Sequence, residues 1–398
     1  MFLFVTVYAL YSCSGILAQS CSPIVQYTNL TINGNTISNV AGNFSDCCQY
    51  CQQKSNCVAY SWYNGTCILK SSAQPLYKAV GYLTAVLSPN SNNTYSLQTS
   101  YNGSTFFNNF TFISYTDPSG GDVNYTTQAQ AQSLGLVQVL AGGQVYIGVD
   151  NTTIVPLNAT RGRAAVRIQS KPIYNSGLFI FNLAHMPEGL GTWPAFWSYA
   201  NPWPYNGEID ILEAIYTMPN NQISLHTSQN CTMPSNPGYI NGAWGTKTTD
   251  CFTNYTAGIS GCSIEAPNGT FGSAFNQAGG GVFAMEWDRF NFIRIWNFVQ
   301  PNIPSDIASG SPNPNPSTWG LPNAYFPFGQ NCSATHFNNQ TLVINTDLCG
   351  SWVGSKFPGG ASNCSTFVRS NPQYYSNAYY LINSLNVYCK PNDPYCVL

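Results

Sequence analysis

Charged residues are scarce in this chain. Only 7% of its 398 residues are Asp, Glu, Lys or Arg, and the formal net charge is −2. Binding to nucleic acid requires a basic stripe that neutralises phosphates, and docking to an anionic membrane requires a polybasic cluster. The 13 Lys and Arg residues are too few and too dispersed for either. We therefore expect neither a nucleic acid nor a membrane surface as a partner.

Histidine is rare as well, and the common cofactor motifs are missing. The three histidines all lie far from the run Cys47-Cys48-x-x-Cys51, so this run lacks the histidine partners of a mixed zinc site. The sequence contains no phosphate-binding loop, no Gly-x-Ser-x-Gly elbow and no cluster of metal ligands. We expect no organic cofactor and no catalytic metal.

Long apolar runs are absent too, since no stretch approaches the about 18 apolar residues of a membrane-spanning helix. The run Phe2–Leu10 is too short to cross a bilayer, and small residues follow it at Ala18-Gln19-Ser20. This pattern is typical of a secretory signal peptide with its cleavage site. We expect residues 1–20 to be removed and the mature protein to be secreted to the extracellular space.

Cysteine, in contrast, is abundant, with 15 residues, of which Cys13 falls in the expected signal peptide. The other 14 occur in even groups, which predicts disulfides formed in an oxidising compartment, although the sequence leaves the pairings open. Fifteen Asn-x-Ser/Thr sequons, from Asn29 to Asn363, favour the same secretory route and glycosylated surface loops. The groups are Cys21, Cys47, Cys48, Cys51, Cys57 and Cys67, then Cys231, Cys251, Cys262, Cys332, Cys349 and Cys364, and finally Cys389 and Cys396.

The composition along the chain indicates two globular blocks. Residues 21–87 form a cysteine-rich module, and the Ser- and Asn-rich residues 88–94 have the composition of a linker. Residues 95–398 contain short β-type runs separated by Gly, Pro and Asn turns, with weak helical periodicity only near Gln128–Val137. These features predict an all-β protein with one large β-sandwich in the second block. Strands are expected in runs that include 145–149, 165–168, 177–182, 281–286 and 292–296.

Three acids, Glu208, Asp210 and Glu213, stand within six residues of a chain that has only 15 acidic residues. Apolar residues alternate with them, as in a half-buried strand. Glu208 and Asp210 share a face by the period of two, whereas Glu213 falls on the other face of a regular strand. A β-bulge at Ile211–Leu212 would bring Glu213 back beside the other acids. The outer carboxyl groups would then lie about 5–5.5 Å apart, the separation of a retaining glycosidase.

Crowded carboxyl groups on one side of a sheet have divergent pKa values, because desolvation and like charge raise one pKa while another group stays ionised. Glycoside hydrolysis uses this division, with one carboxylate as nucleophile and one carboxylic acid as proton donor. The alternative interpretation is an exposed edge strand with a solvated acidic face. The apolar alternation and the tryptophans just upstream favour the catalytic interpretation.

A series of motifs occurs in order between residues 92 and 390. In order and spacing these stretches resemble glycoside hydrolase family 16, and in particular the fungal-type endo-1,3(4)-β-glucanases or laminarinases. The stretches are His185-Met-Pro-Glu-Gly-Leu-Gly-Thr-Trp-Pro-Ala-Phe-Trp197, Trp203-Pro-Tyr-Asn-Gly-Glu-Ile-Asp-Ile-Leu-Glu213, Leu225-His-Thr-Ser228, Gly279-Gly-Gly-Val-Phe-Ala-Met-Glu286, Pro304-Ser-Asp-Ile-Ala-Ser-Gly310, Trp319-Gly-Leu-Pro322 and Leu348-Cys-Gly-Ser-Trp352.

The resemblance implies a β-jelly-roll of two curved sheets with an open cleft along the concave face. Through the motif Glu-x-Asp-x-x-Glu it implies that Glu208 is the nucleophile and Glu213 the general acid/base, with Asp210 tuning the nucleophile. The six-residue form of the motif is similar to that of the laminarinase branch. Some relatives carry a structural calcium ion, which cannot be judged from the sequence.

Three tryptophans flank the acids. The family match implies that Trp197 and Trp203 lie in the cleft as stacking platforms near the cleaved bond. Trp193, just before a proline at the expected start of a strand, is assigned to the core, where a tryptophan buries much apolar area. An even offset would place Trp193 and Trp197 on one face of a regular strand, so the strand period does not separate them.

Further candidates for the cleft come from the same resemblance. His226 is expected on the strand after the acids, where it would hydrogen-bond within their cluster, and a buried structural histidine is the alternative. Arg167, Glu286 and Trp319 lie in family-like stretches and are expected to line the cleft.

The N-terminal block carries Cys47-Cys48-Gln-Tyr-Cys51, Cys57-Val-Ala-Tyr-Ser-Trp62 and Cys67-Ile-Leu69. These spacings resemble a PAN/apple module over about 65 residues. The resemblance implies a fold held by disulfides that binds carbohydrate or protein. A cystine-rich spacer without a ligand is the alternative.

The sequence therefore predicts a secreted, monomeric, retaining endo-β-glucanase that acts on 1,3-linked or mixed 1,3/1,4 β-glucan, with a second ligand, cell-wall carbohydrate or protein, for residues 21–87. The alternatives are a transglycosylase or a galactan hydrolase of the same family, and a catalytically silent glucan-binding protein of the cell surface. The complete set of acids disfavours the last, because a binding protein gains nothing from burying like charges.

Overall fold

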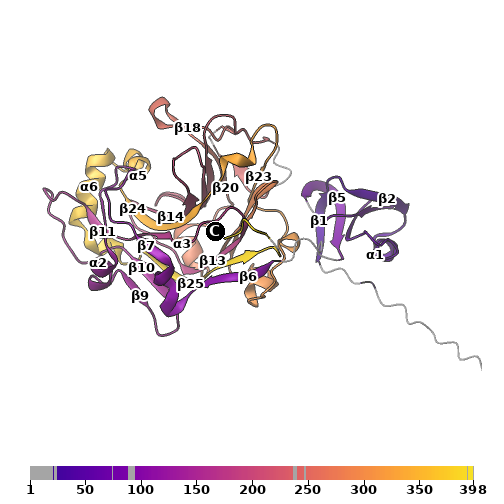
Figure 1. Cartoon of the computed structure of the whole chain (residues 1–398), viewed down its shortest axis with the longest axis horizontal. Helices are drawn as coiled ribbons and strands as arrows, with labels where there is room; N and C mark the ends of the chain where they lie inside the picture. The colour runs from indigo at the N-terminus through magenta and orange to yellow at the C-terminus, as the bar shows by residue number, and fades with distance from the viewer. Residues whose placement is uncertain are drawn as a thin grey trace, which may run out of the picture.

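The computed structural model describes residues 21, 25–73, 75–87, 95–235, 240–245, 248–391 and 393–397. Figure 1 shows a small N-terminal module beside a larger β-rich body. The predicted signal peptide (1–20) and the predicted linker (88–94) lie outside the described residues. Among those residues, no helix is long and apolar enough to cross a membrane.

The N-terminal module is one antiparallel sheet with a helix, α1 (Phe44–Gln52), packed on one face. The buried residues of α1 are all cysteines, and they join the helix to other parts of the module through three disulfides. These pairs are Cys21–Cys48, Cys47–Cys67 and Cys51–Cys57, so the predicted even group closes on itself. In spatial order the strands are β1 (Val25–Ile32), β5 (Leu76–Val86), β3 (Ala59–Tyr63), β4 (Thr66–Lys70) and β2 (Thr36–Ala41).

The larger body contains two eight-stranded sheets. The acidic sheet, named for the three acids on β15, has the order β17 (Ala243–Trp244), β20 (Cys262–Glu265), β16 (Gln222–His226), β15 (Glu208–Glu213), β14 (Thr192–Tyr199), β24 (Thr341–Leu348), β12 (Arg167–Ser170) and β7 (Phe110–Phe112). The opposite sheet has the order β23 (Ala324–Pro327), β22 (Phe292–Val299), β21 (Gly281–Asp288), β13 (Gly177–His185), β25 (Tyr379–Cys389), β10 (Val145–Gly148) and β9 (Val137–Val139), with β6 (Ser96–Tyr101) also paired to β25.

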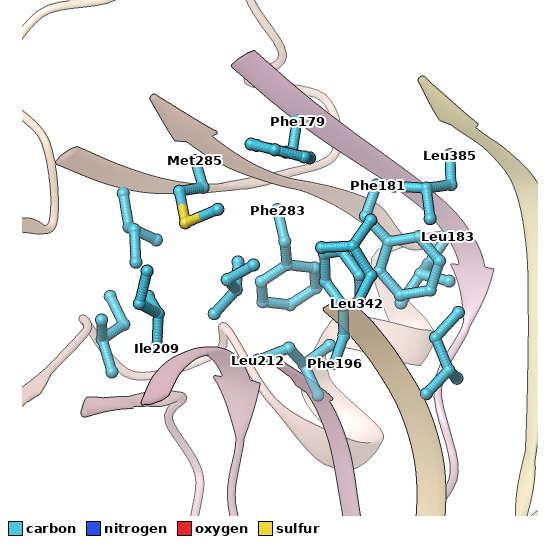
Figure 2. Close-up of a cluster of buried hydrophobic side chains, with 14 of the residues drawn as sticks. Phe179, Phe181, Leu183, Phe196, Ile209, Leu212, Phe283, Met285, Leu342 and Leu385 are labelled. Carbon is cyan, nitrogen blue, oxygen red and sulfur yellow. The ribbon is translucent and has the colours of Figure 1, made fainter. Parts of the chain in front are cut away.

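The core lies between the two sheets and is built by strand alternation. Phe181 and Phe283 of the opposite sheet face Phe196 and Ile209 of the acidic sheet, and all four are fully buried (Figure 2). Each such side chain stabilises the fold by about 1.5–3 kcal/mol relative to an exposed one. Because successive side chains of a strand point to opposite faces, the burial of Ile209 turns its neighbour Glu208 away from the core.

The remaining elements are short. The β-strand pairs are β8 (Val123–Tyr125) with β11 (Arg163–Ala165), and β18 (Thr253–Asn254) with β19 (Ile259–Ser260). The α-helices are α2 (Gln128–Ser133), α3 (Gly272–Gln277), α4 (Ser305–Ala308), α5 (Ser351–Lys356) and α6 (Gly360–Ser370), and the 3₁₀ turns are η2 (Gly103–Asn109), η4 (Tyr255–Ala257), η5 (Pro316–Thr318), η6 (Ala334–His336) and η7 (Pro372–Tyr375).

The expected all-β class is correct, and helix α2 forms within the weakly periodic region. Helix α6 was not expected from the sequence. Only Cys364 and Val368 of this helix are buried, so its sequence has no long apolar stripe. The disulfide Cys349–Cys364 attaches α6 to the end of β24, a contact that helical periodicity does not report.

Four disulfides hold the larger body, and they also stay within the predicted groups. Cys231–Cys332 joins residues 101 positions apart, whereas Cys251–Cys262, Cys349–Cys364 and Cys389–Cys396 close short loops. Closing a loop of about 100 residues removes on the order of 4–5 kcal/mol of chain entropy from the unfolded state. The last of these disulfides closes the segment that follows β25.

The module contacts the larger body through Tyr27 and Leu321. The amide of Gly320 donates a hydrogen bond to the Tyr27 hydroxyl at 3.2 Å, and burial raises the pKa of this phenol to about 12. Leu321 packs against the small apolar cluster of the module that contains Ile32 and Leu76. The two blocks are therefore joined by side-chain contacts as well as by the chain.

The expectation that Glu286 and Trp319 line the cleft is wrong. Glu286 lies on β21 between Met285 and Trp287, which point into the core, so it lies on the outer face of the opposite sheet. There it is fully buried, accepts a hydrogen bond from the Tyr95 hydroxyl at 3.0 Å and forms an ion pair with Arg294. Trp319 packs edge-on against Trp296 on that same outer face.

We predict that Glu286→Ala lowers the free energy of unfolding by about 3–5 kcal/mol and leaves kcat unchanged, because it strands the buried Arg294 cation. The double variant Glu286→Leu/Arg294→Met should recover most of the loss, since it removes both charges. Denaturant unfolding together with initial rates tests this. A fall in kcat without a loss of stability would indicate that Glu286 takes part in catalysis.

Candidate active site

The three acids lie on one face of β15 because this strand contains a bulge. Opposite β14, Phe196 pairs with Leu212 and the next residue, Trp197, pairs with Asp210, so Ile211 is an extra residue. Ile211 and Leu212 are both fully buried in the core, although they are consecutive. The predicted bulge at Ile211–Leu212 is confirmed, and it returns Glu213 to the face that carries Glu208 and Asp210.

Asn221, just before β16, holds the bulge in place. Its Oδ1 accepts the Glu213 amide at 2.8 Å, and its Nδ2 donates to the Ile211 carbonyl at 2.8 Å. Strand β16 pairs with β15 only from Glu208 to Asp210. Beyond Asp210, these two side-chain bonds replace the backbone hydrogen bonds between the strands. Because Asn221 is fully buried, water competes little for these two bonds, and they fix the direction of Glu213.

Glu208 is held from two sides. The indole nitrogen of Trp203 donates to its Oε2 at 2.6 Å, and His226 Nε2 lies 3.7 Å from its Oε1. The preceding Gly207 has φ +79°, and a Cβ there would lie 2.5 Å from the ring of Phe337. A glycine is therefore required at this point, and it sets the direction in which the strand starts.

His226 lies where the sequence predicted it, on the strand next to the acids. It pairs directly with Glu208 across the sheet, and its Nε2 is 3.2 Å from Asp210 Oδ2. Its other ring nitrogen lies 3.1 Å from the hydroxyl of Thr253 on β18, which fixes the ring plane. His226 therefore links Asp210 to Glu208 within one buried cluster.

Glu213 has a partner, Trp193, that was assigned to the core and does pack against the buried cluster that contains Leu348 and Val353. The indole nitrogen of Trp193 donates to Glu213 Oε1 at 3.0 Å. Strand β14 pairs with β24 residue by residue from Thr192 to Tyr199, so its alternation is unbroken. Trp193 and Trp197 therefore share the acid face, and Trp193 is only half-buried.

Trp197 and Arg167 form the part of this face next to Asp210. The guanidinium of Arg167 lies 5.0 Å above the Trp197 ring, which also stacks on Tyr199 with ring centroids 5.0 Å apart. The Trp197 indole nitrogen donates to Asn345 Oδ1 at 2.7 Å. Both residues lie on the acidic sheet as expected, and their contact with a sugar stays a prediction.

Burial raises the pKa of Glu208 to about 8, and the charge of Asp210 adds to this. The charge of Glu213 acts in the same direction, whereas His226 and the hydrogen bond from Trp203 oppose it. Like charges so close together cannot all ionise near neutral pH, and the cluster therefore retains a proton. Such a cluster can supply both a carboxylate and a carboxylic acid.

One oxygen of Glu208, one oxygen of Asp210 and one nitrogen of His226 lie within 4.8 Å of one another, close enough to share a metal ion. The hydrogen-bonding distance between His226 and Asp210 accounts for the same arrangement without one. We therefore assign these three side chains to one proton-sharing cluster.

The residues that sequence reasoning missed are Asn221, Trp193, Thr253 and Tyr255. Tyr255, on η4, stacks on Trp203 with ring centroids 5.4 Å apart. Only for Trp193 did the sequence contain a relevant pattern, because its even offset from Trp197 places both residues on one face of the strand. The other three come from segments whose place beside the acids depends on the folded chain.

Two family models match the chain. Residues 110–388 match the XgeA-like, catalytic GH16 domain, and residues 21–101 match the PAN domain. The second match extends over β6, which in the structure pairs with β25 of the larger body.

Several known proteins are similar to this chain. An endo-1,3(4)-beta-glucanase of Arthroderma benhamiae is 38% identical over 310 residues, which cover 76% of this chain and 66% of that protein. An endo-1,3(4)-beta-glucanase of Emericella nidulans, xgeA, is 35% identical over 74% of this chain and 47% of its own length. The chain thus spans from less than half to about two thirds of the length of the curated relatives it matches.

Solved structures of family 16 enzymes are also similar to the larger body. GH16 laminarinase 16A from Phanerochaete chrysosporium, with beta-glucans in both donor and acceptor sites, has a TM-score of 0.69 at 36% identity over 74% of this chain and 100% of its own. An elongating GH family 16 beta-1,3-glucosyltransferase has a TM-score of 0.68 at 36% identity over the same shares. The catalytic-domain match covers most of the chain, and the relatives that share it are more than 30% identical. The chain belongs to glycoside hydrolase family 16, with a PAN domain at its N-terminus.

Proposed function

We propose that this protein is a retaining endo-β-glucanase that cleaves 1,3-linked or mixed 1,3/1,4 β-glucan. The observation that carries the proposal is the bulge in β15, which places Glu208 and Glu213 on one face with unlike surroundings. The names of the relatives, endo-1,3(4)-beta-glucanase, and the beta-glucans bound to the similar laminarinase support this substrate class.

In the proposed mechanism Glu208 attacks the anomeric carbon while Glu213 donates a proton to the departing glycosidic oxygen. The resulting glycosyl ester on Glu208 is then attacked by water, and Glu213 takes up the proton of that water. Trp203 holds one oxygen of Glu208, and Trp193 holds one oxygen of Glu213. Each carboxyl group is therefore oriented by one indole N–H.

The mechanism requires one proton in the cluster, located on Glu213. The raised pKa of Glu208 ensures that the cluster keeps a proton at neutral pH. The N–H of Trp203 and the nearby His226 favour the ionised form of Glu208 and oppose the effect of burial, and we assign the proton to Glu213 in the reacting complex. Asp210 then acts through the cluster, by setting how tightly the proton is held.

A second candidate function is β-1,3-glucosyl transfer. It is favoured by the similarity to an elongating glucosyltransferase, which is as strong as the similarity to the laminarinase. Transfer uses the same acids and differs in whether a sugar or water accepts the glycosyl group. Product sizes from laminarin, lichenan, agarose and chitin distinguish the functions, since transfer gives products longer than the substrate.

We propose further that the protein is secreted and that its N-terminal PAN domain binds cell-wall carbohydrate or a protein. The seven disulfides among the described residues support an oxidising compartment. A tethered binding domain would keep the catalytic body close to an insoluble substrate.

Glu208→Gln should lower the turnover of laminarin by several orders of magnitude, because the attacking oxyanion is lost while the shape is kept. It should also stabilise the fold near neutral pH. The pKa of Glu208 is raised from 4.5 to about 8 on folding, so the wild type loses stability as pH rises through this window.

The melting-temperature difference between this variant and the wild type should therefore grow from pH 4.5 to pH 8 and vanish below pH 4.5. Thermal melts across this range, with laminarin rates beside them, measure both effects. Near-normal rates of laminarin hydrolysis by Glu208→Gln would show that Glu208 is not the nucleophile.

Asn221→Ala should lower kcat by about a hundredfold, because the bulge relaxes and Glu213 moves relative to Glu208. The matched control is Asn276→Ala, since Asn276 also makes two side-chain bonds to one backbone segment, at Met186. Both variants should lose about 1–3 kcal/mol of stability. Equal kcat in the two variants would show that Asn221 is merely structural.

A further inference from the structure

A hollow of about 420 Å³ lies on the larger body, away from the acids. One wall is the end of β21 and the turn into β22, and the other is the loop closed by the disulfide Cys389–Cys396. The three acids lie on the acidic sheet, whereas both of these walls belong to the opposite sheet. Its volume is within the range of about 300–1,000 Å³ that is usual for ligand sites.

Two aromatic rings line this hollow and are open to solvent. Phe290 is 63% exposed and Tyr395 is 39% exposed, and their rings meet edge-on with centroids 5.8 Å apart. The guanidinium of Arg289 lies 4.7 Å above the Tyr395 ring, which steadies that ring. Such a pair presents apolar surface of the kind on which the apolar face of a sugar ring packs.

Two hydrogen-bond donors in the lining have no acceptor among the described residues. The first is the indole nitrogen of Trp287, a residue only 1% exposed, and the second is the buried Nη1 of Arg289. The other terminal nitrogen of Arg289 donates to Asn338 Oδ1 at 3.1 Å. Each of these nitrogens exposes less than 1 Å², so a ligand oxygen reaches them only after the lining side chains shift.

The charges of the lining balance. Lys390 Nζ lies 3.0 Å from Asp288 Oδ2, and the charge of Arg289 is matched by Asp393 in the same lining. The site therefore has no excess cation that would select a phosphate or a carboxylate. Exposed rings and charged side chains whose charges cancel together fit a neutral ligand rich in hydroxyl groups.

We propose that this hollow is a second glycan-binding site, in which a sugar residue of a neutral polysaccharide packs on the exposed rings of Phe290 and Tyr395, beside Asp288 and Lys390. The choice of β-1,3-glucan as that polysaccharide rests on the proposed function, whereas the glycan class rests on the lining alone. A second point of attachment raises the effective concentration of the acids along an insoluble polymer and has no effect on short soluble chains.

The test uses the full chain with Glu208→Gln, so that bound polymer is not cleaved. Its retention on insoluble β-1,3-glucan, cellulose and chitin is compared with that of two further variants, Phe290→Ala/Tyr395→Ala and Arg289→Ala. The matched control is Tyr374→Ala, since Tyr374 is an aromatic residue that is 55% exposed and lies on η7. Melting temperatures identify any variant that fails to fold.

We expect the two site variants to bind β-1,3-glucan about three- to tenfold more weakly, as the loss of one stacked ring implies. The control should be unchanged. In the background that retains Glu208, kcat/KM on laminarihexaose should stay within about twofold of the wild type, because a short soluble chain gains nothing from a second attachment point.

Unchanged retention of folded site variants on all three polysaccharides would overturn the proposal. A loss confined to cellulose or chitin would overturn β-1,3-glucan as the ligand. Failure of the proposed function would be seen separately. In that case the wild type would leave laminarin uncleaved, while the site variants would still bind β-1,3-glucan more weakly than the control.

Discussion

The site depends on one extra residue in one strand. Without the bulge at Ile211, alternation would turn Glu213 into the core and leave Glu208 and Asp210 without a second catalytic partner. The core accepts the bulge because Ile211 and Leu212 both bury their side chains, and Asn221 satisfies the backbone groups that the interrupted ladder leaves. The packing of the sandwich and the geometry of the acids are therefore set by the same local feature.

The bulge also creates the electrostatic problem that the neighbouring residues resolve. Three carboxyl groups are drawn together at low exposure, which favours a retained proton. Trp203 and Trp193 each donate one indole N–H to a different glutamate, and His226 bridges Glu208 and Asp210. These unlike partners give the two glutamates different environments, as a nucleophile and a proton donor require.

Sequence reasoning identified those features that depend on short spacing. The three acids, the bulge and the even cysteine groups follow from local patterns, whereas the place of His226 followed from the family resemblance, and the structure confirms all four. Glu286 was misplaced because motif matching does not report which face of β21 turns inward. Asn221 and Thr253 were missed because only the folded chain brings their segments to the acids. Trp193 was separated from Trp197 although the unbroken strand keeps them on one face.

The central claim is that Glu208 and Glu213 act by double displacement. The most direct measurement is proton NMR of laminarin during the first minutes of digestion, before mutarotation mixes the anomers. Two successive inversions retain the configuration, so the β-anomer should form first and the α-anomer should follow only by mutarotation. An α-anomer as the initial product would contradict both the double displacement and the carboxyl geometry attributed to the bulge.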